Sequence, residues 1–129
     1  MKRRTPKYLT YQDYVIKDGI FIGEFERLYQ DYDDPWFQSV KEREAPDKTI
    51  ALHLIKKLKI KKVIELGCGL GYFTNEIGKI GVEVLGIDIS RTAIRKARSM
   101  FPMCRFLTCD VLNYGIYRSF QPNLIVMAS

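Results

Sequence analysis

A glycine-rich loop preceded by an acid is the part of the sequence best suited to binding chemistry. The stretch ELGCGLGYF covers residues 65–73, and Glu65 stands before its glycines. The glycines occupy every second position of the loop: Gly67, Gly69 and Gly71. Because glycine has no Cβ, a ligand can approach the backbone of such a loop closely. The chemistry therefore depends on which ligand this loop accepts.

The spacing of the glycines separates two kinds of ligand. A dinucleotide site needs G-x-G-x-x-G, whose last glycine lets the following helix pack closely. This sequence has G-x-G-x-G instead, and Tyr72 occupies the position of the last dinucleotide glycine. The acid Glu65 would repel a pyrophosphate and attract a cation. The pattern therefore favours a nucleoside that carries a positive charge and no phosphate, and S-adenosylmethionine fits this description.

Alternating strands and helices must position this loop. Short apolar runs predict four strands, and apolar residues at helical spacing fall between the earlier ones. This alternation indicates an α/β fold with a parallel, Rossmann-like sheet and helices on both faces. The strands are predicted at KVIEL (62–66), VEVLGIDIS (82–90), CRFLTCDV (104–111) and NLIVMAS (123–129).

Capping residues and apolar faces mark the helices. Asp47 is a candidate N-cap for the first helix, and Ser90 for a later helix that Pro102 ends. A helix between them runs from Tyr72 to near Gly81. The residues expected to face inward are Ile50, Ala51, Leu54, Ile55 and Leu58 in the first helix, and Ala93, Ile94, Ala97 and Met100 in the later one.

Acidic residues gather at one edge of the predicted sheet. In open α/β sheets, ligands bind beyond the carboxyl ends of the strands. Glu65, Asp88 and Asp110 all come at or near the end of a strand, and Ser129 ends the fourth strand. We expect them to contribute to one site. Alternative roles stay open, namely a surface acid for Glu65 and Asp88, a turn cap for Asp110, and a tight turn for the glycines.

Three motifs together resemble a known family. VIELGCGLGYF, VLGIDIS and FLTCDV are similar to the first three motifs of class I S-adenosylmethionine-dependent methyltransferases, and the resemblance covers residues 47–129. It implies that the methionine part of the cofactor is held by Glu65, near the ammonium group, and by the loop residues Gly67, Cys68, Gly69 and Gly71.

The resemblance also implies roles at the later strand ends. Asp88 would accept hydrogen bonds from both ribose hydroxyls, and Ile89 would pack on the adenine. Asp110 would accept from the exocyclic amine of adenine, and the Val111 backbone N–H would meet a ring nitrogen. Ser129 lies where contacts to the methyl acceptor often begin in this family, and no other catalytic residue is identified.

The front segment, residues 1–46, is aromatic-rich and precedes the domain at residues 47–129. Its stretch GIFIGEFERLYQDYDDPWFQ, with Asp-Pro-Trp, resembles the N-terminal lid of small-molecule methyltransferases, including nodulation-type and sugar N-methyltransferases. This resemblance implies that Tyr32 and Trp36 cover the cofactor and shape the acceptor pocket. The alternative, of equal weight, is that these aromatic residues only pack a core.

Composition limits the other classes of function. Three cysteines form no CxxC pair and only His53 could join them, so no structural zinc or other metal site is expected. Cys68 could be a nucleophile, but we favour a small loop residue because no histidine is close to activate it. The odd cysteine count, with no signal peptide and no membrane span, indicates a cytoplasmic protein.

Net charge and length leave the partners open. The charge of +6 gathers at residues 56–62 and 91–100, which we interpret as solvated helix faces rather than a nucleic-acid surface. The family has a seven-stranded sheet, whereas this chain ends with the fourth strand. We therefore expect a fragment, or a short form completed by a partner. The open edge of the last strand favours self-association.

Two functions of different classes remain. The first is S-adenosylmethionine-dependent methyl transfer to a small molecule, such as a sugar-like amine or hydroxyl acceptor. The second is a truncated module that binds the cofactor without catalysis. An RNA methyltransferase is a third and weaker hypothesis, because only the charge supports it.

Overall fold

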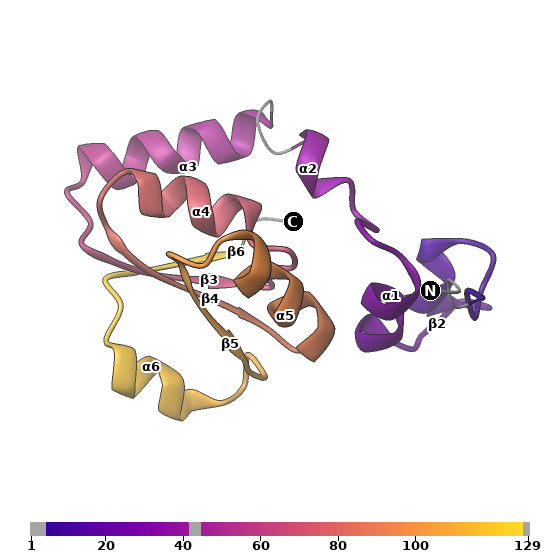
Figure 1. The fold of residues 1–129 in the computed structure, drawn as a ribbon. Helices are drawn as coiled ribbons and strands as arrows, with labels where there is room; N and C mark the ends of the chain where they lie inside the picture. Colours follow the sequence, from indigo (N-terminus) through magenta and orange to yellow (C-terminus); the bar gives the residue numbers. More distant parts are fainter. Residues whose placement is uncertain (1–4, 42–44, 128–129) are drawn as a thin grey trace.

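The computed structural model describes residues 5–41 and 45–127. Its main element is a sheet of four parallel strands in the order β5-β4-β3-β6 (Figure 1). The strands are β3 (Lys62–Leu66), β4 (Glu83–Asp88), β5 (Arg105–Thr108) and β6 (Leu124–Met127). The predicted Rossmann-like parallel sheet is confirmed, although β4 and β5 are shorter than their motifs.

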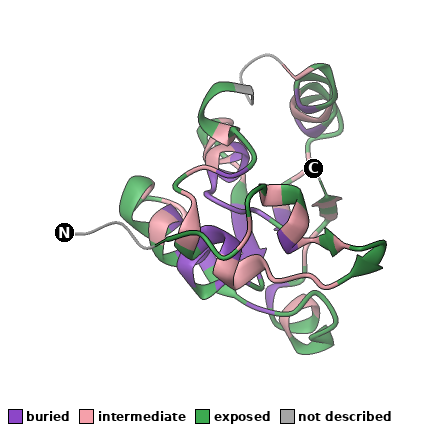
Figure 2. Cartoon of the chain, turned by 90° about the vertical axis from the view of Figure 1, so that its right-hand side faces the viewer, coloured by how far each residue is buried: buried purple, intermediate pink, exposed green. Residues whose placement is uncertain are grey.

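Helices cover both faces of the sheet, as predicted. The helices α3 (Pro46–Lys57), α4 (Tyr72–Lys79) and α5 (Arg91–Met100) lie on one face, and α6 (Tyr114–Phe120) lies on the other (Figure 1). Side chains that alternate along the strands separate two cores. Val63, Val84 and Phe106 pack beneath α3, α4 and α5, while Ile64, Leu85 and Ile87 share the opposite face with Phe120. Buried residues gather in the sheet and on the inner sides of the helices (Figure 2).

The first helix of the sheet domain differs from its prediction. Asp47 is not the N-cap, because α3 begins one residue earlier with Pro46 in its first turn, where proline's fixed φ suits a helix. Of the residues expected to face inward, Ile55 is buried and Ala51 packs on the core. The predicted face is wrong for the remaining three, since α3 is rotated so that Lys48, Ala51, Leu52 and Ile55 face inward, and it leaves three residues exposed: Ile50, Leu54 and Leu58.

The later helices also show one success and two differences. Ser90 caps α5 as predicted, because its hydroxyl accepts a hydrogen bond from the Ala93 N–H. Met100, expected to face inward, is exposed at the end of α5. The short helix α6 was not predicted, and Ile116, Tyr117 and Phe120 pack on the core from it.

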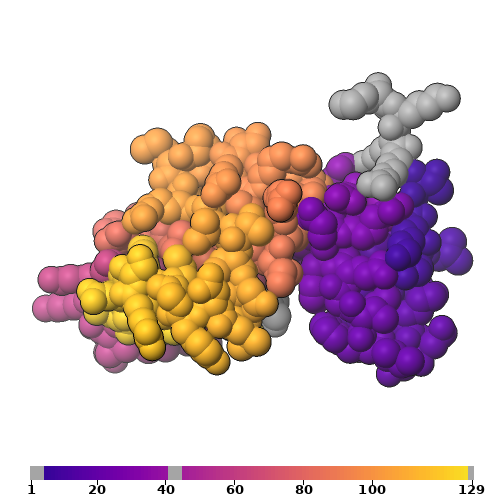
Figure 3. All heavy atoms as spheres, turned by 90° about the horizontal axis from the view of Figure 1, so that it is seen from below, coloured from indigo at the N-terminus to yellow at the C-terminus, as the bar shows by residue number. Residues whose placement is uncertain are grey.

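The N-terminal residues form a small body beside the sheet (Figure 3). They comprise a 3-10 helix (Tyr11–Tyr14), a hairpin of β1 (Ile16–Lys17) and β2 (Ile20–Phe21), and the helices α1 (Phe25–Asp31) and α2 (Gln38–Lys41). We call residues 5–41 the N-terminal unit. Tyr14 and Leu28 are its fully buried side chains. The Tyr14 hydroxyl donates to Asp31, which also accepts from Arg27.

Polar contacts at both ends of α1 attach this unit to α5. The Glu26 carboxylate accepts hydrogen bonds from the Ser90 hydroxyl at 2.8 Å and from the Thr92 N–H at 2.9 Å. Lys96 donates to the carbonyl oxygens of Tyr29 at 2.6 Å and Tyr32 at 3.0 Å. An acid therefore lies at the N-terminus of α5 and a cation at the C-terminus of α1, which are the favourable arrangements with the helix dipoles.

Candidate functional site

The glycine loop joins β3 to α4 at the carboxyl edge of the sheet, as predicted. All three glycines adopt positive φ angles, with 65° at Gly67, 55° at Gly69 and 84° at Gly71. A Cβ on Gly71 would lie 2.5 Å from the Phe106 ring, and a Cβ on Gly69 would lie 2.6 Å from the side-chain oxygen of Gln38. A Cβ on Gly67 would meet nothing within 4 Å. Two glycines thus allow close packing inside the protein, whereas Gly67 faces open space.

The backbone amides of the loop donate within the chain. Four consecutive N–H groups have acceptors at 2.9–3.0 Å, and two of these acceptors are side-chain oxygens. The pairs are Cys68 to the Ile87 carbonyl, Gly69 to the Asp88 carboxylate, Leu70 to the Gln38 amide oxygen, and Gly71 to the Cys68 carbonyl. A phosphate-binding loop presents such amides to its ligand. This loop therefore suits a ligand without phosphates, in agreement with the interpretation of its spacing.

Asp88 lies at the end of β4 and is 8% exposed, so it is not a surface acid. Its two carboxylate oxygens accept hydrogen bonds from the Gly69 and Ser90 N–H groups, both at 2.9 Å. Burial raises the pKa of Asp88 above its usual value, although the backbone hydrogen bonds act in the opposite direction. The carboxylate therefore joins the glycine loop to the start of α5.

Glu65 lies within β3, where it pairs with Gly86, and is 2% exposed. Its carboxylate points toward α4 and accepts a hydrogen bond from the Thr74 hydroxyl. Glu65 is therefore a buried acid beneath α4 rather than an acid at the surface. The thiol of Cys68 is fully buried, and its pKa is raised by this burial and by the charges of Glu65 and Asp88. A protonated, buried thiol fits the small loop residue that we favoured over a nucleophile.

The ends of β4 and β5 carry exposed apolar side chains next to acids. Ile89 follows Asp88 and is 56% exposed, and Val111 follows Asp110 and is 40% exposed. Asp110 accepts a hydrogen bond from the Leu112 N–H at 2.9 Å, so it does cap the turn that follows. The two apolar residues leave a surface at the strand ends that suits a flat, largely apolar ring.

The aromatic residues of the proposed lid differ in their surroundings. Tyr32 packs inside the N-terminal unit, with its ring 5.8 Å from that of Tyr14 and its hydroxyl near the carbonyl of Tyr8. Trp36 is 37% exposed, and its ring contacts the Tyr11 ring edge to face at 5.3 Å. The packing alternative thus describes Tyr32 better than Trp36. Ser129, the predicted acceptor contact, lies outside the described residues.

Sequence reasoning missed two residues that touch the site. Gln38 bonds the glycine loop, and the Tyr29 hydroxyl would lie 2.7 Å from a Cβ on Gly69. Both lie in the stretch at residues 19–38 that resembles a lid, but nothing in its pattern distinguishes them from their neighbours.

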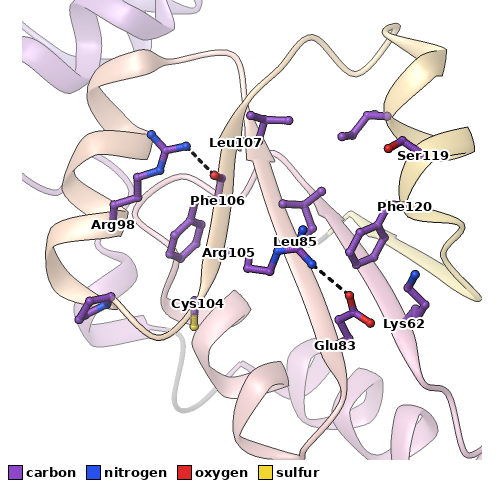
Figure 4. A pocket seen from close by; sticks show the side chains of 12 residues that line it. Lys62, Glu83, Leu85, Arg98, Cys104, Arg105, Phe106, Leu107, Ser119 and Phe120 are labelled. Atoms are coloured by element: carbon purple, nitrogen blue, oxygen red, sulfur yellow. Dashed lines mark hydrogen bonds and ion pairs between the residues drawn. The ribbon is translucent and has the colours of Figure 1, made fainter.

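A cavity of about 680 Å³ lies elsewhere, between α5, β5 and α6 (Figure 4). Lys62, Glu83 and Arg105, which line it, begin strands, so this cavity borders the amino edge of the sheet. Its charges are paired, because Arg105 forms an ion pair with Glu83 at 3.0 Å and Arg98 donates to the Phe106 carbonyl at 2.8 Å. Within residues 5–41 and 45–127, no cluster of metal-ligating side chains is found.

A family model described as a methyltransferase domain matches residues 63–128, more than half of the chain. The chain belongs to this methyltransferase family. The matched residues run from β3 to the end of β6 and include the glycine loop, Asp88 and Asp110. Membership implies S-adenosylmethionine as the cofactor, and the resemblance to class I enzymes is confirmed. No curated protein matches the chain.

Three solved structures are similar to the chain, and two of them are described as methyltransferases or putative methyltransferases. A putative caffeoyl-CoA O-methyltransferase from Staphylococcus aureus is 16% identical over 75% of this chain and 54% of its own, with a TM-score of 0.57. A structure described as "Conversion of a Disulfide Bond into a Thioacetal Group during Echinomycin Biosynthesis" is 24% identical over 61% of this chain and 35% of its own, with a TM-score of 0.53. A third, the plantazolicin methyltransferase BpumL in complex with SAH, is 25% identical over 66% of this chain and 37% of its own, with a TM-score of 0.47.

The chain is shorter than these proteins. It covers 54% of the Staphylococcus aureus structure and 35% of the echinomycin one. Among the helices in residues 5–41 and 45–127, none is long and apolar enough to cross a membrane.

Proposed function

We propose that this chain builds the cofactor site of a methyltransferase that acts on a small molecule, with an amine or hydroxyl of a sugar-like compound as the acceptor. The glycine loop carries the proposal. Its amides from Cys68 to Gly71 donate within the chain, while Gly67 faces open space. A phosphate would find few donors there, whereas a cationic nucleoside would find the negative charge of Glu65 and Asp88 nearby.

The loop residues have separate roles in holding the methionine part. Gly67 offers open backbone for the ligand, and Cys68, Gly69 and Gly71 keep the loop in its tight shape. Glu65 contributes buried negative charge on the side of the ammonium group, with Thr74 fixing its carboxylate.

The later strand ends hold the nucleoside. Asp88 accepts from the ribose hydroxyls, because a carboxylate has about four acceptor positions and so is not exhausted by the amides of the loop. Ile89 and Val111 pack against the adenine, with the Val111 N–H facing a ring nitrogen. Asp110 accepts from the exocyclic amine while it also caps its turn, since its carboxylate is exposed.

Alignment is the main task of the protein in such a reaction. The cofactor supplies an activated methyl group on a sulfonium sulfur, and the acceptor's lone pair forms the new bond as the carbon–sulfur bond breaks. Holding the acceptor in line with that bond can contribute up to about 7–11 kcal/mol. A side-chain base is needed only where the acceptor must lose a proton before or during attack.

The N-terminal unit forms one wall of the acceptor side in this proposal. We divide the chain into a lid segment at residues 1–46 and the cofactor domain at residues 47–129. Of Tyr32 and Trp36, Trp36 is the more exposed, and Gln38, two positions after it, lies against the glycine loop. The three free cysteines support a cytoplasmic location, where thiols stay reduced.

The function is tested by turnover. The protein is incubated with S-adenosylmethionine and panels of amines, hydroxyl compounds and a structured RNA, and formation of the demethylated cofactor is measured. We expect product with a sugar-like amine or hydroxyl and none with RNA. Product with RNA alone would overturn the acceptor class, and cofactor binding without turnover on any acceptor would favour a binding module.

A further inference from the structure

Gln38 lies directly against the glycine loop although it belongs to the N-terminal unit. Its amide oxygen accepts from the Leu70 N–H at 2.9 Å, and its amide nitrogen donates to the Cys68 carbonyl at 3.4 Å. Gly69 makes room for it, because a Cβ there would lie 2.6 Å from the same amide oxygen. One side chain thus pairs with a donor and an acceptor of the loop, 30 and 32 positions away in the chain.

The Asp-Pro-Trp segment holds Gln38 in this place. The Asp34 carboxylate accepts hydrogen bonds from the Gln38 N–H at 2.8 Å and from the Ser39 N–H at 3.0 Å. It therefore caps the start of α2, where Gln38 is the first residue. The Tyr29 hydroxyl lies on the same side of Gly69 as the Gln38 amide, because a Cβ on Gly69 would lie 2.7 Å from it.

We propose that Gln38 is a positioning residue of the cofactor site. It holds the covered part of the loop, residues 68–70, so that the open part at Gly67 keeps one shape for the cofactor. The inference rests on the proposed role of the loop in binding S-adenosylmethionine. It also assigns a task to Asp34, which fixes Gln38 rather than touching the cofactor itself.

The physical reason lies in the freedom of the loop. Three glycines with positive φ make its backbone more mobile in the absence of restraints than other residues would. Ordering such a loop at the moment of binding lowers affinity, and restraints that order it beforehand raise affinity. Without Gln38 the Leu70 amide would also lack its acceptor in a partly buried position. We therefore expect loss of the amide group to weaken cofactor binding.

The test compares Gln38→Met, which keeps the length of the side chain but not its hydrogen bonds, with Lys96→Met. The Lys96 variant removes the contacts of α5 to the carbonyls of α1 and leaves the loop contacts intact. Binding of demethylated cofactor is measured by calorimetry on the whole chain, and hydrogen exchange of the Leu70 amide is measured by NMR without ligand. Gln38→Glu, which keeps the acceptor for Leu70, serves as the conservative variant.

We expect Gln38→Met to bind about tenfold more weakly, with faster exchange at Leu70, as the loss of a hydrogen bond of about 1–1.5 kcal/mol implies. Gln38→Glu should recover most of the affinity, and Lys96→Met should lower the melting temperature more than the affinity. Unchanged or tighter binding by Gln38→Met would overturn the inference, as would an equal loss in Lys96→Met. Absence of binding by the unaltered chain would instead overturn the proposed function. In that case, hydrogen exchange of the Leu70 amide in Gln38→Met would still test whether Gln38 orders the loop.

Discussion

Acids at the two edges of the sheet stand in different environments. At the carboxyl edge, Glu65 and Asp88 are buried, and hydrogen bonds from a hydroxyl and from backbone amides fix their oxygens. At the amino edge, Glu83 is exposed and forms a surface ion pair with Arg105. Exposed pairs contribute about 0–1 kcal/mol, whereas losing the partner of a buried polar group costs about 1–3 kcal/mol. Residue type alone therefore does not make a site, and burial with fixed partners does.

The size of a cavity does not by itself mark the site either. The space of about 680 Å³ borders the amino edge, and no residue of the glycine loop lines it. The carboxyl edge has its polar groups already arranged around an open Gly67. Size and chemistry thus point to opposite edges, and the family match agrees with the chemistry. The following predictions compare one edge with the other, beginning with the largest effect.

Gly71→Ala should destabilise the protein more than Gly81→Ala. Both glycines have positive φ, which costs about 1–2 kcal/mol for alanine. Only at Gly71 would the new Cβ also strike a neighbour, the Phe106 ring at 2.5 Å, and overpacking adds about 1–3 kcal/mol. Urea unfolding of both variants measures the difference. Equal losses would show that the loop can shift to accept a side chain.

Asp88→Ala should weaken cofactor binding by about 1.5–3 kcal/mol, the range for hydrogen bonds to a charged group. Glu83→Ala removes an acid of the other edge and should leave the affinity unchanged, because only a surface ion pair is lost. Titration calorimetry with demethylated cofactor compares the two. An unchanged affinity in Asp88→Ala would remove this residue from the ribose site.

The raised pKa of Asp88 predicts two opposite trends with pH. The folded protein holds this proton more tightly than the unfolded chain, so stability falls as pH rises from the ordinary pKa of 3.8 through the raised folded value. Cofactor affinity runs the other way, because the protonated carboxyl loses negative charge and acceptor capacity. Affinity should therefore drop as pH falls through the folded pKa, by at most about tenfold per pH unit.

Asp88→Asn is the control for these trends. It removes the titrating group, so the contribution of this site to both pH profiles should disappear. Calorimetry and urea unfolding from pH 7 to pH 4 measure affinity and stability on the same samples. Affinity that is independent of pH in the unaltered chain would contradict the binding role of an ionised Asp88.

The smallest effect is expected for the binding of RNA to the basic residues. The lysines of the basic run at residues 56–62 are exposed apart from the half-buried Lys62, and Arg105 at the amino edge is already paired. The outward part of α3 offers no surface beside these lysines on which RNA bases could stack. We therefore expect no specific RNA binding. Fluorescence anisotropy with a structured RNA at physiological salt is the measurement. Tight and salt-sensitive binding would make the amino edge a functional surface.

The sequence predicted the strands and the glycine loop because both follow from local patterns. KVIEL forms β3 over the same residues, and Ser90 caps α5, since a capping side chain acts within three positions of itself. Local patterns failed where contacts with distant parts of the chain determine which side chains are buried. The inward face of α3 depends on how the helix meets the sheet, and Leu54 is exposed for that reason.

Burial of the acids could not be read from the sequence either. Glu65 and Asp88 end apolar runs, a position that suits a surface acid as well as a buried one. Only the packing of Thr74 over Glu65 and the amide of Gly69 against Asp88 decides between them. The contact of Gln38 with the loop has no local signal, because it joins segments about thirty positions apart.

The measurement that tests the account most directly is calorimetry of the unaltered chain with S-adenosylhomocysteine and, separately, with NAD. The account holds that a loop with its amides bonded inside the chain accepts a nucleoside without phosphates. It predicts saturable binding of S-adenosylhomocysteine and no heat from NAD. Tight binding of NAD with no response to S-adenosylhomocysteine would contradict it.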